Sequence, residues 1–266
     1  MKTLMKRMDT LDPLFVRDSK KVINFIIGSD WKVETQKNFF KAIIATIPDT
    51  ESYKQDYKTE LLRLIKIAQD ARDTNELSTA QEGKWINYSG IIEKIAKLNE
   101  DFKNTGIISD ALLLSYFYGG TYFAPYRLEE LSNLKIYTPD IDTNKDNYFD
   151  GTTIILNKYK TFNKYGKITQ KIPQELADLL TQYYNQKKHD KNTYLITDYR
   201  GNQSSTRSII GKLEKTFGAS VNILRKSFIT NLYDTNKLKT NKQMKHVATE
   251  MRDSLEMMLS YRWIKD

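Results

Sequence analysis

Apolar residues recur at helical spacing through the first hundred positions of the chain. Residues 14–48 contain two stripes, Val22, Phe25 and Ile26 in the first and Phe39, Phe40, Ile43 and Ile44 in the second. Segment 57–72 repeats the pattern with Leu61, Leu62, Ile65 and Ile67, and segment 83–100 repeats it with Ile91, Ile92, Ile95 and Leu98. Apolar positions three and four apart line one face of an α-helix. Residues 1–102 are therefore predicted to form a small helical bundle, and residues 103–266 a second domain.

The pattern in the second domain is mixed. An apolar helix is expected over 107–119, and a short one over 127–134. The β-branched runs at 152–156 and 167–172 flank a turn rich in Lys, Asn and Gly, which is typical of a β-hairpin. Pro173 is suited to the first turn of a helix. A short strand and turn at 193–203 precede helices at about 204–216, 221–234 and 241–251 and a last segment, SLEMMLSYRW. The predicted fold is mainly α with a small β-sheet or hairpin.

One helical segment, NILRKSFITNLY at 222–233, combines an apolar stripe with a basic pair. Leu224, Phe228 and Leu232 are spaced to face a core, yet Arg225 and Lys226 lie between them. Either the pair lies on an ordinary solvated face, or a buried helix holds Arg225 in position to bind an anion.

The charge of the chain indicates which classes of partner it binds. Its 266 residues carry a formal net charge of +9, with an isoelectric point near 9.3. Such an excess of positive charge favours binding to a polyanion, nucleic acid first and an anionic membrane surface second. A basic surface that binds no such partner is the alternative. The chain has no cysteine, which excludes disulfides and thiolate chemistry, and its two histidines, His189 and His246, make a multi-histidine metal site improbable.

Nothing in the sequence predicts a membrane segment. The N-terminus lacks the apolar stretch of a signal peptide, and the longest uncharged run, 111–126, is shorter than a bilayer span and interrupted by glycine and proline. We therefore expect a soluble intracellular protein, in the cytoplasm or nucleus.

Three basic sites and one tyrosine are candidates for chemistry. Arg127 and Glu130 in PYRLEELSNL are spaced either for a surface ion pair or for an anion site. A hairpin tip carries several lysines, which either protect a sheet edge or enter a DNA groove. The others are Arg225 and, near the C-terminus, Tyr261. The tip lysines are Lys158, Lys160, Lys164 and Lys167.

In their order along the chain these segments resemble the tyrosine recombinase, or phage-integrase-like, family. PYRLEELSNL resembles the first arginine box, ILNKYKTFNKYGKITQKIP the β-hairpin with its catalytic lysine, and NILRKSF the His-x-x-Arg box. ATEMRDSLEMMLSY resembles the segment that leads to the nucleophile. The resemblance covers roughly 105–266 and implies a catalytic domain there, preceded by a helical core-binding domain that helps to clamp DNA.

The resemblance implies a chemistry and a partner. Tyr261 would attack a DNA phosphodiester and remain bonded to the 3′ phosphate, Arg127 and Arg225 would hold its oxygens, and Lys160 would protonate the leaving oxygen. Glu130 would orient Arg127. Lys158, Lys164 and Lys226 would face DNA. No cofactor or metal is needed, the partner is double-stranded DNA, and the protein would act as a dimer or tetramer on it.

Two positions depart from the family's pattern. Asn222 stands where the His-x-x-Arg box has its histidine, and Asp253 stands where a later histidine or tryptophan is expected. A carboxylate at the second position repels a phosphate unless it is paired. Arg252 and His246 are alternative donors. The gap from Asp253 to Tyr261 is also one residue shorter than the family's.

These departures keep other functions open. A non-catalytic DNA-binding protein on the same fold is the main alternative to a recombinase or integrase, and a strand-swivelling topoisomerase of the type IB kind is another. The abundance of Lys, Asn, Ile and Tyr is consistent with an A·T-rich source such as a mobile element or a DNA virus.

Overall fold

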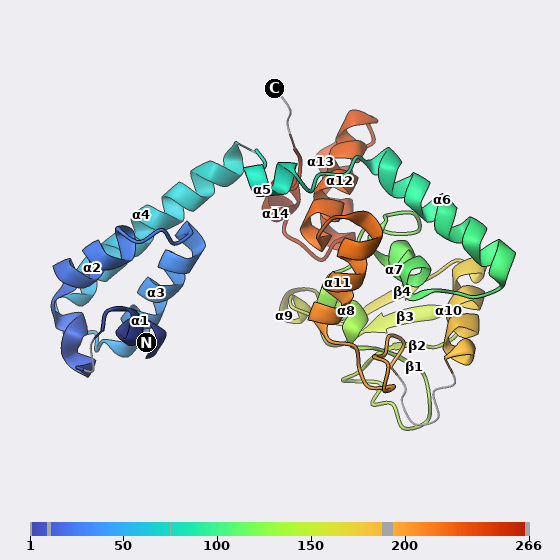
Figure 1. Ribbon diagram of the computed structural model, residues 1–266, viewed down its shortest axis with the longest axis horizontal. Coiled ribbons are helices and arrows are strands. Elements are labelled where there is room, and N and C mark those ends of the chain that lie inside the picture. The colour runs from blue at the N-terminus through green and yellow to red at the C-terminus, as the bar shows by residue number, and fades with distance from the viewer. Residues whose placement is uncertain (1, 10–11, 75, 188–193, 264–266) are drawn as a thin grey trace. The chain divides into compact units, whose positions relative to one another are not determined.

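The computed structural model describes residues 2–9, 12–74, 76–187 and 194–263 (Figure 1). His189 lies outside these residues. The chain divides into two compact units, Met1–Glu76 and Leu77–Asp266, and each has its own hydrophobic core.

The first unit is entirely helical where it is described. Its elements are α1 (Lys2–Arg7), the 3₁₀ helix η1 (Pro13–Arg17), α2 (Ser19–Ile27), α3 (Val33–Thr46) and α4 (Lys54–Asp73). Asp18 begins α2, where its carboxylate accepts the backbone N–H of Lys21. The core contains Val22, Ile26, Phe40, Ile43, Tyr57 and Leu64, together with Leu4, Val16 and Ile47.

The buried face of α4 differs from the predicted one. Leu64 and Tyr57 are buried, whereas Leu62 is 64% exposed and Ile65 and Ile67 are also exposed. Of the predicted stripe of Leu61, Leu62, Ile65 and Ile67, Leu61 packs against the core and the other three are exposed, because the buried positions are seven residues apart and lie on a narrower stripe.

The second unit contains the remaining helices and all the strands of the described chain. Its helices are α5 (Thr79–Glu82), α6 (Tyr88–Thr105), α7 (Asp110–Tyr118), α8 (Leu128–Ser132), α9 (Phe162–Tyr165), α10 (Gln174–Gln186), α11 (Thr206–Phe217), α12 (Val221–Asp234), α13 (Asn241–Glu250) and α14 (Leu255–Leu259). The helix predicted over 83–100 therefore exists as α6. Its buried residues Ile91 and Ile95 belong to the core of the second unit, so the chain divides by packing after Glu76, upstream of the expected boundary at 102.

A four-stranded sheet lies within the second unit (Figure 1). The strands are β1 (Leu134–Ile136), β2 (Asn147–Phe149), β3 (Thr153–Leu156) and β4 (Ile168–Lys171), in that spatial order. β1 and β2 are parallel, and the other pairs are antiparallel. The predicted hairpin is confirmed as β3 and β4. The strand expected within 193–203 forms only isolated bridges, Lys135 with Tyr194 and Thr197 with Gln203.

The predicted fold class, mainly α with a small sheet, is confirmed. In α12, Leu224 and Phe228 are buried and Leu232 is half-buried, as their spacing indicates. The ring of Phe228 lies 2.4 Å from the position that a Cβ on Gly120 would take, so the turn after α7 needs glycine there, where φ is +72°. Across the described ranges, no helix is both long and apolar enough to cross a bilayer.

Candidate active site

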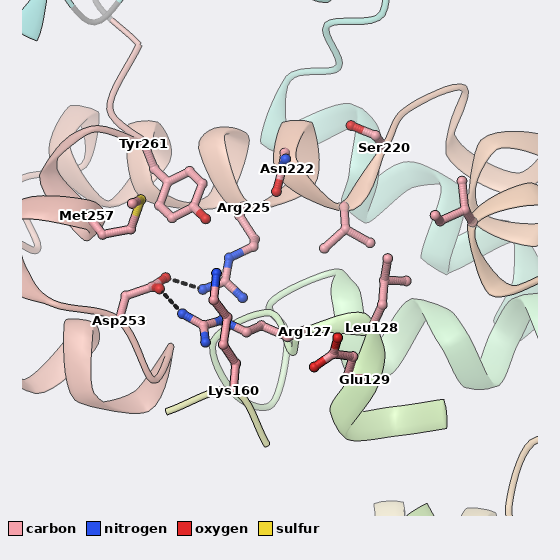
Figure 2. Close-up of a pocket in the computed structure, with 12 residues that line it drawn as sticks. Arg127, Leu128, Glu129, Lys160, Ser220, Asn222, Arg225, Asp253, Met257 and Tyr261 are labelled. Atoms are coloured by element: carbon pink, nitrogen blue, oxygen red, sulfur yellow. Dashed lines mark hydrogen bonds and ion pairs between the residues drawn. The ribbon is translucent and has the colours of Figure 1, made fainter. Parts of the chain in front are cut away.

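One pocket of the second unit collects residues from all four segments singled out in the sequence. Its volume is about 380 Å³. Figure 2 shows the side chains of Arg127, Lys160, Arg225, Asp253 and Tyr261 converging on it. The rest of the lining is Leu128, Glu129, Ile210, Ser220, Val221, Asn222 and Met257. The cations, the carboxylate and the phenol are therefore neighbours, although up to 134 residues separate them in the sequence, from Arg127 to Tyr261.

Arg225 is the most buried cation of the pocket. Its residue is 1% exposed because Leu224 and Phe228 hold this part of α12 in the core. Its Nη1 donates to the carbonyl of Pro125 at 3.0 Å, and its Nη2 donates to the carbonyl of Met251 at 3.0 Å and pairs with Asp253. Of the basic pair in NILRKSF, Arg225 thus points inward in a fixed orientation. Lys226 is half-buried and does not line the pocket.

Arg127 reaches the pocket from the residue just before α8. Its backbone N–H donates to Glu130 Oε2 at 2.9 Å, and its guanidinium pairs with Asp253. The surface ion pair considered for Arg127 and Glu130 does not form. Glu130 is completely buried and holds Arg127 through the backbone rather than through the guanidinium.

Asp253 joins the two arginines. One carboxylate oxygen pairs with Arg127 and the other with Arg225, and the Asp253 side chain is 2% exposed (Figure 2). A buried carboxylate needs such partners, because an unpaired charge in the interior is costly. The carboxylate that the sequence places among the cations is therefore paired, and the trio keeps a net charge of +1.

Arg252 and Glu130 form a second buried pair behind the pocket. Arg252 Nη1 lies 3.1 Å from Glu130 Oε2, and its guanidinium lies 4.0 Å from the centre of the Tyr126 ring. Burial raises the pKa of the Glu130 carboxyl, and the charge of Arg252 acts against that rise. Arg252 adopts a left-handed φ of +57°, which turns the chain so that Asp253 can meet the arginines. Arg252 is thus directed away from the pocket lining.

His246 lies away from the pocket. It is on α13 with its side chain 73% exposed, and its Nε2 is 3.6 Å from Glu250 Oε1. The pocket lining contains no histidine.

Lys160 reaches the pocket from the loop between β3 and β4. The loop is fastened at two points: Thr161 Oγ1 donates to the carbonyl of Arg252 at 3.0 Å, and Tyr165 Oη donates to the carbonyl of Asp253 at 2.7 Å. These bonds fix the loop to the turn that carries Asp253. Lys158 and Lys164 are exposed and do not line the pocket.

Tyr261 follows the last helix, α14. The guanidinium of Arg225 lies 5.2 Å from the centre of its ring, and Figure 2 shows the hydroxyl directed towards the arginines. Within the described chain the hydroxyl has no hydrogen-bond partner, so its oxygen is available to another group.

Two arginine nitrogens of the pocket lack acceptors. Arg127 Nη1 and Arg225 Nε are buried and make no hydrogen bond within the part of the chain that the structure describes. Buried polar groups are nearly always paired in folded proteins. Both nitrogens belong to residues that line the pocket, while Arg252 Nε, behind it, is unpaired as well among the described residues.

The first turn of α12 adds to this positive environment. Ser220 precedes the helix without capping it through its side chain, and Asn222 lies in the first turn, exposed to the pocket. The unpaired N–H groups and the dipole at a helix N-terminus favour negative charge. Sequence reasoning did not identify Ser220 or Glu129, although a serine before an apolar-periodic helix is a recognisable cap position.

The described residues contain no group of three His, Asp or Glu side chains placed to hold a metal ion.

Comparison with known proteins gives a fold-level likeness. No protein-family model matches the chain, and no curated protein is significantly similar to it. Among solved structures, the chain is similar to one titled "Crystal structure of XerA recombinase", with a TM-score of 0.47 and 14% identity over all of this chain and 84% of that chain.

Proposed function

We propose that this chain is a DNA strand-transferase of the tyrosine recombinase type, which cuts and rejoins duplex DNA through a 3′-phosphotyrosine. The observation that carries the proposal is the pocket in which the Tyr261 phenol, two paired arginines and Lys160 meet. A phenol beside fixed cations is suited to attack a phosphodiester, because the cations favour the phenolate and the charge that develops on phosphorus.

Each side chain has a distinct task in this reaction. Tyr261 releases its hydroxyl proton to water, and its oxygen then forms a bond to phosphorus as the bond from phosphorus to the 5′ oxygen breaks. The non-bridging oxygens accept hydrogen bonds from the guanidinium groups of Arg127 and Arg225, which line the pocket. Lys160 donates a proton to the departing 5′ oxygen. Rejoining is the same sequence in reverse, with a 5′ hydroxyl as the nucleophile.

Asn222 and Asp253 take roles that differ from those of imidazoles. The Asn222 amide donates a hydrogen bond to a phosphate oxygen but transfers no proton. Asp253 holds the two guanidinium groups at a fixed separation and partly neutralises them. Arg252 holds Glu130, which in turn holds the backbone of Arg127, so neither contacts the phosphate. His246 has no part in the reaction.

Duplex DNA is the proposed partner. The second unit, Leu77–Asp266, has 28 lysines and arginines against 21 acidic residues, so it carries most of the net charge of +9. Lys158, Lys164 and Lys226 contribute contacts to the backbone, a part of the affinity that weakens with salt. We also propose that copies associate on DNA as a dimer or tetramer, since exchanging strands requires more than one nucleophile.

A non-catalytic DNA-binding protein is the second candidate, and one observation favours it. Asp253 already occupies both arginines, and the pocket lining offers no imidazole to relay a proton. In such a protein the pocket would bind a phosphate of the DNA backbone without cleaving the strand.

A nicked duplex from which the cleaved end diffuses away tests the proposal. Wild-type protein should accumulate a covalent adduct that denaturant does not remove, and Tyr261→Phe should not. Absence of any adduct on a DNA that the protein binds excludes the enzyme and leaves the binding protein. Relaxation of supercoiled plasmid by dilute monomer, without recombinant products, would instead identify a topoisomerase.

A further inference from the structure

The segment that carries Tyr261 packs against the residues just before α6 through two tryptophans, Trp263 and Trp85. The rings of Trp85 and Trp263 have centroids 4.3 Å apart and planes inclined by 58°. Both residues belong to the second unit and are half-buried. Aromatic pairs at this distance add stability beyond the area that they bury. Trp263 is two residues after Tyr261, so the contact acts directly next to the proposed nucleophile.

Trp85 is itself held in place. Its indole N–H donates to Asn87 Oδ1 at 2.7 Å, and its backbone N–H donates to the carbonyl of Glu82 at 3.0 Å. The ring also packs against the main core of the unit. Tyr88, three residues later, donates from its hydroxyl to the carbonyl of Gly120 at 3.0 Å. Trp85 is therefore a fixed surface for Trp263.

Helix α12 also contacts this segment, at its three successive residues Tyr261, Arg262 and Trp263. Arg225 lies over Tyr261 at 5.2 Å, Tyr233 lies under the guanidinium of Arg262 at 4.5 Å, and Thr230 Oγ1 accepts the backbone N–H of Trp263 at 2.9 Å. The helix that aims Arg225 thus also carries the contacts that locate the tyrosine.

Backbone hydrogen bonds hold the segment between α14 and Trp263 in a compact turn. Tyr261 N–H donates to the carbonyl of Met258, and Arg262 N–H donates to that of Leu259, both at 3.1 Å, so the residues after the helix continue in a tight turn. Only three residues separate Leu259 from Trp263. For Tyr261 to enter the pocket of another copy, the tryptophan stack and the Thr230 bond must both be broken.

We propose that the stack of Trp85 on Trp263 seats Tyr261 in the arginine pocket of its own chain, so that the nucleophile acts in cis. The inference rests on the proposed function of Tyr261. Trp85 and Trp263 are positioning residues, since neither lines the pocket. Two residues span at most about 7 Å, so a shift of Trp263 moves Tyr261 almost directly. A displacement of about 1 Å in a reacting group can cost about 100-fold in rate.

The first test separates positioning from binding. Trp263→Ala and Trp85→Ala should slow adduct formation on saturating nicked DNA about 10- to 100-fold, with the Kd for DNA unchanged. Trp263→Phe should restore most of the rate, because a phenyl ring still stacks. Trp31→Phe is the matched control, since Trp31 packs on Phe25 and Phe39 in the first unit. Wild-type rates in both alanine variants overturn the inference.

The second test detects the stacking of Trp85 on Trp263 by fluorescence, without DNA cleavage. In protein with Trp31→Phe, excited at a wavelength that tyrosine does not absorb, only Trp85 and Trp263 fluoresce. Adding Trp263→Ala should make the remaining emission of Trp85 more accessible to acrylamide, whereas adding Tyr261→Phe should leave the accessibility unchanged. An unchanged accessibility after Trp263→Ala means that the stack is absent in solution and overturns the inference. A wild-type protein that shows the stack but never forms an adduct contradicts the proposed function instead.

The third test concerns the choice between cis and trans. Arg225→Ala protein retains Tyr261 but lacks an intact pocket, and Tyr261→Phe protein has the pocket but no nucleophile. Mixed on one DNA that binds several copies, they should form no more adduct than either alone. Recovery of adduct on the Arg225→Ala chain would show that the tyrosine serves a neighbouring copy.

Discussion

Asp253 pairs with Arg225 while the side chains of both are only 2% exposed. The same carboxylate pairs with Arg127 through its other oxygen. Ions taken out of water pay a desolvation penalty, which such pairing offsets only in part, whereas removal of one partner leaves an uncompensated buried charge. Asp253 therefore stabilises the two arginines, and an incoming phosphate must share their guanidinium groups with it.

Removing the Asp253 carboxylate should lower stability and increase the response to anions. We expect Asp253→Ala to lower the free energy of unfolding by about 3–5 kcal/mol, because the buried Arg225 and its neighbour Arg127 lose their shared partner. Inorganic phosphate should then raise the Tm of Asp253→Ala more than that of the wild type, since an anion that binds only the folded state stabilises it.

Thermal unfolding at increasing phosphate concentration measures both effects. The exposed Asp140 is the control position, and Asp140→Ala should behave as the wild type. Equal phosphate responses in Asp253→Ala and wild type would contradict the role assigned to Asp253.

The two arginines should affect cleavage far more than DNA affinity. Arg127→Ala and Arg225→Ala should each slow adduct formation by about 10²–10³, the range for loss of one donor to a developing charge. Many backbone contacts share the binding energy, so the Kd should change little. Lys226→Ala, next to Arg225 and outside the pocket, should show the opposite pattern. Parallel losses of affinity and cleavage in the arginine variants would make them ordinary backbone contacts.

Placing an imidazole at Asn222 should make the reaction faster and dependent on pH. Asn222 is exposed in the first turn of α12 and lines the pocket, so histidine fits without disturbing the core. General acid–base groups contribute about 10²–10⁴ in rate when they are well placed, and an unperturbed imidazole titrates near pH 6.5.

We expect Asn222→His to raise the single-turnover rate about tenfold or more and to add an inflection between about pH 6 and 7. Asn231→His, nine residues further along α12 and outside the pocket lining, should add neither. An unaltered rate and pH profile in Asn222→His would mean that position 222 does not meet the phosphate.

Local pattern predicted much of the fold. Helical spacing gave α2, α3, α4, α6 and α12, and β-branched runs gave the β3–β4 hairpin. The same spacing shows that α6 has an apolar face but not which core receives it. β1 and β2 have three residues each, which is too short for a periodic signal.

The site was only partly predictable, for a related reason. The burial of Arg225 follows from Leu224 and Phe228 beside it. The dual pairing of Asp253 does not, because it depends on three segments meeting in space and on the left-handed turn at Arg252. A non-glycine residue in that conformation is uncommon and carries no sequence signal.

Asp110 should account for part of the stability of the second unit in acid. Burial acts to raise its pKa, but hydrogen bonds from Lys187, Lys212 and Tyr183 outweigh this and lower the pKa to about 2. A carboxyl whose pKa is lower in the folded state adds stability above its unfolded pKa, near 4, and loses it as the pH falls to about 2.

This shift corresponds to about 2 kcal/mol at neutral pH. Asp110→Asn should therefore be less stable than wild type at pH 7, and the two should converge as the pH falls from about 4 to about 2. Denaturant unfolding at several pH values measures this. Asp101→Asn, at an exposed position, should follow the wild type throughout. A difference that persists at pH 2 would mean that the charge of Asp110 is not the cause.

Lys160 should be needed only while the leaving group requires a proton. The fastened β3–β4 loop places Lys160 in the pocket, where we assign it to protonate the departing 5′ oxygen. Lys160→Ala should slow adduct formation on ordinary DNA by about 10²–10⁴. A DNA with sulfur in place of the bridging 5′ oxygen has a leaving group that departs as a thiolate without protonation, so on this substrate the variant should approach the wild-type rate.

Arg127→Ala should remain slow on both substrates, because it loses hydrogen bonds to the non-bridging oxygens rather than the proton donor. Lys164→Ala, on the same loop but outside the pocket, should cleave both at the wild-type rate. If sulfur fails to restore Lys160→Ala, the lysine serves to position the phosphate, and the proton for the leaving oxygen comes from another group.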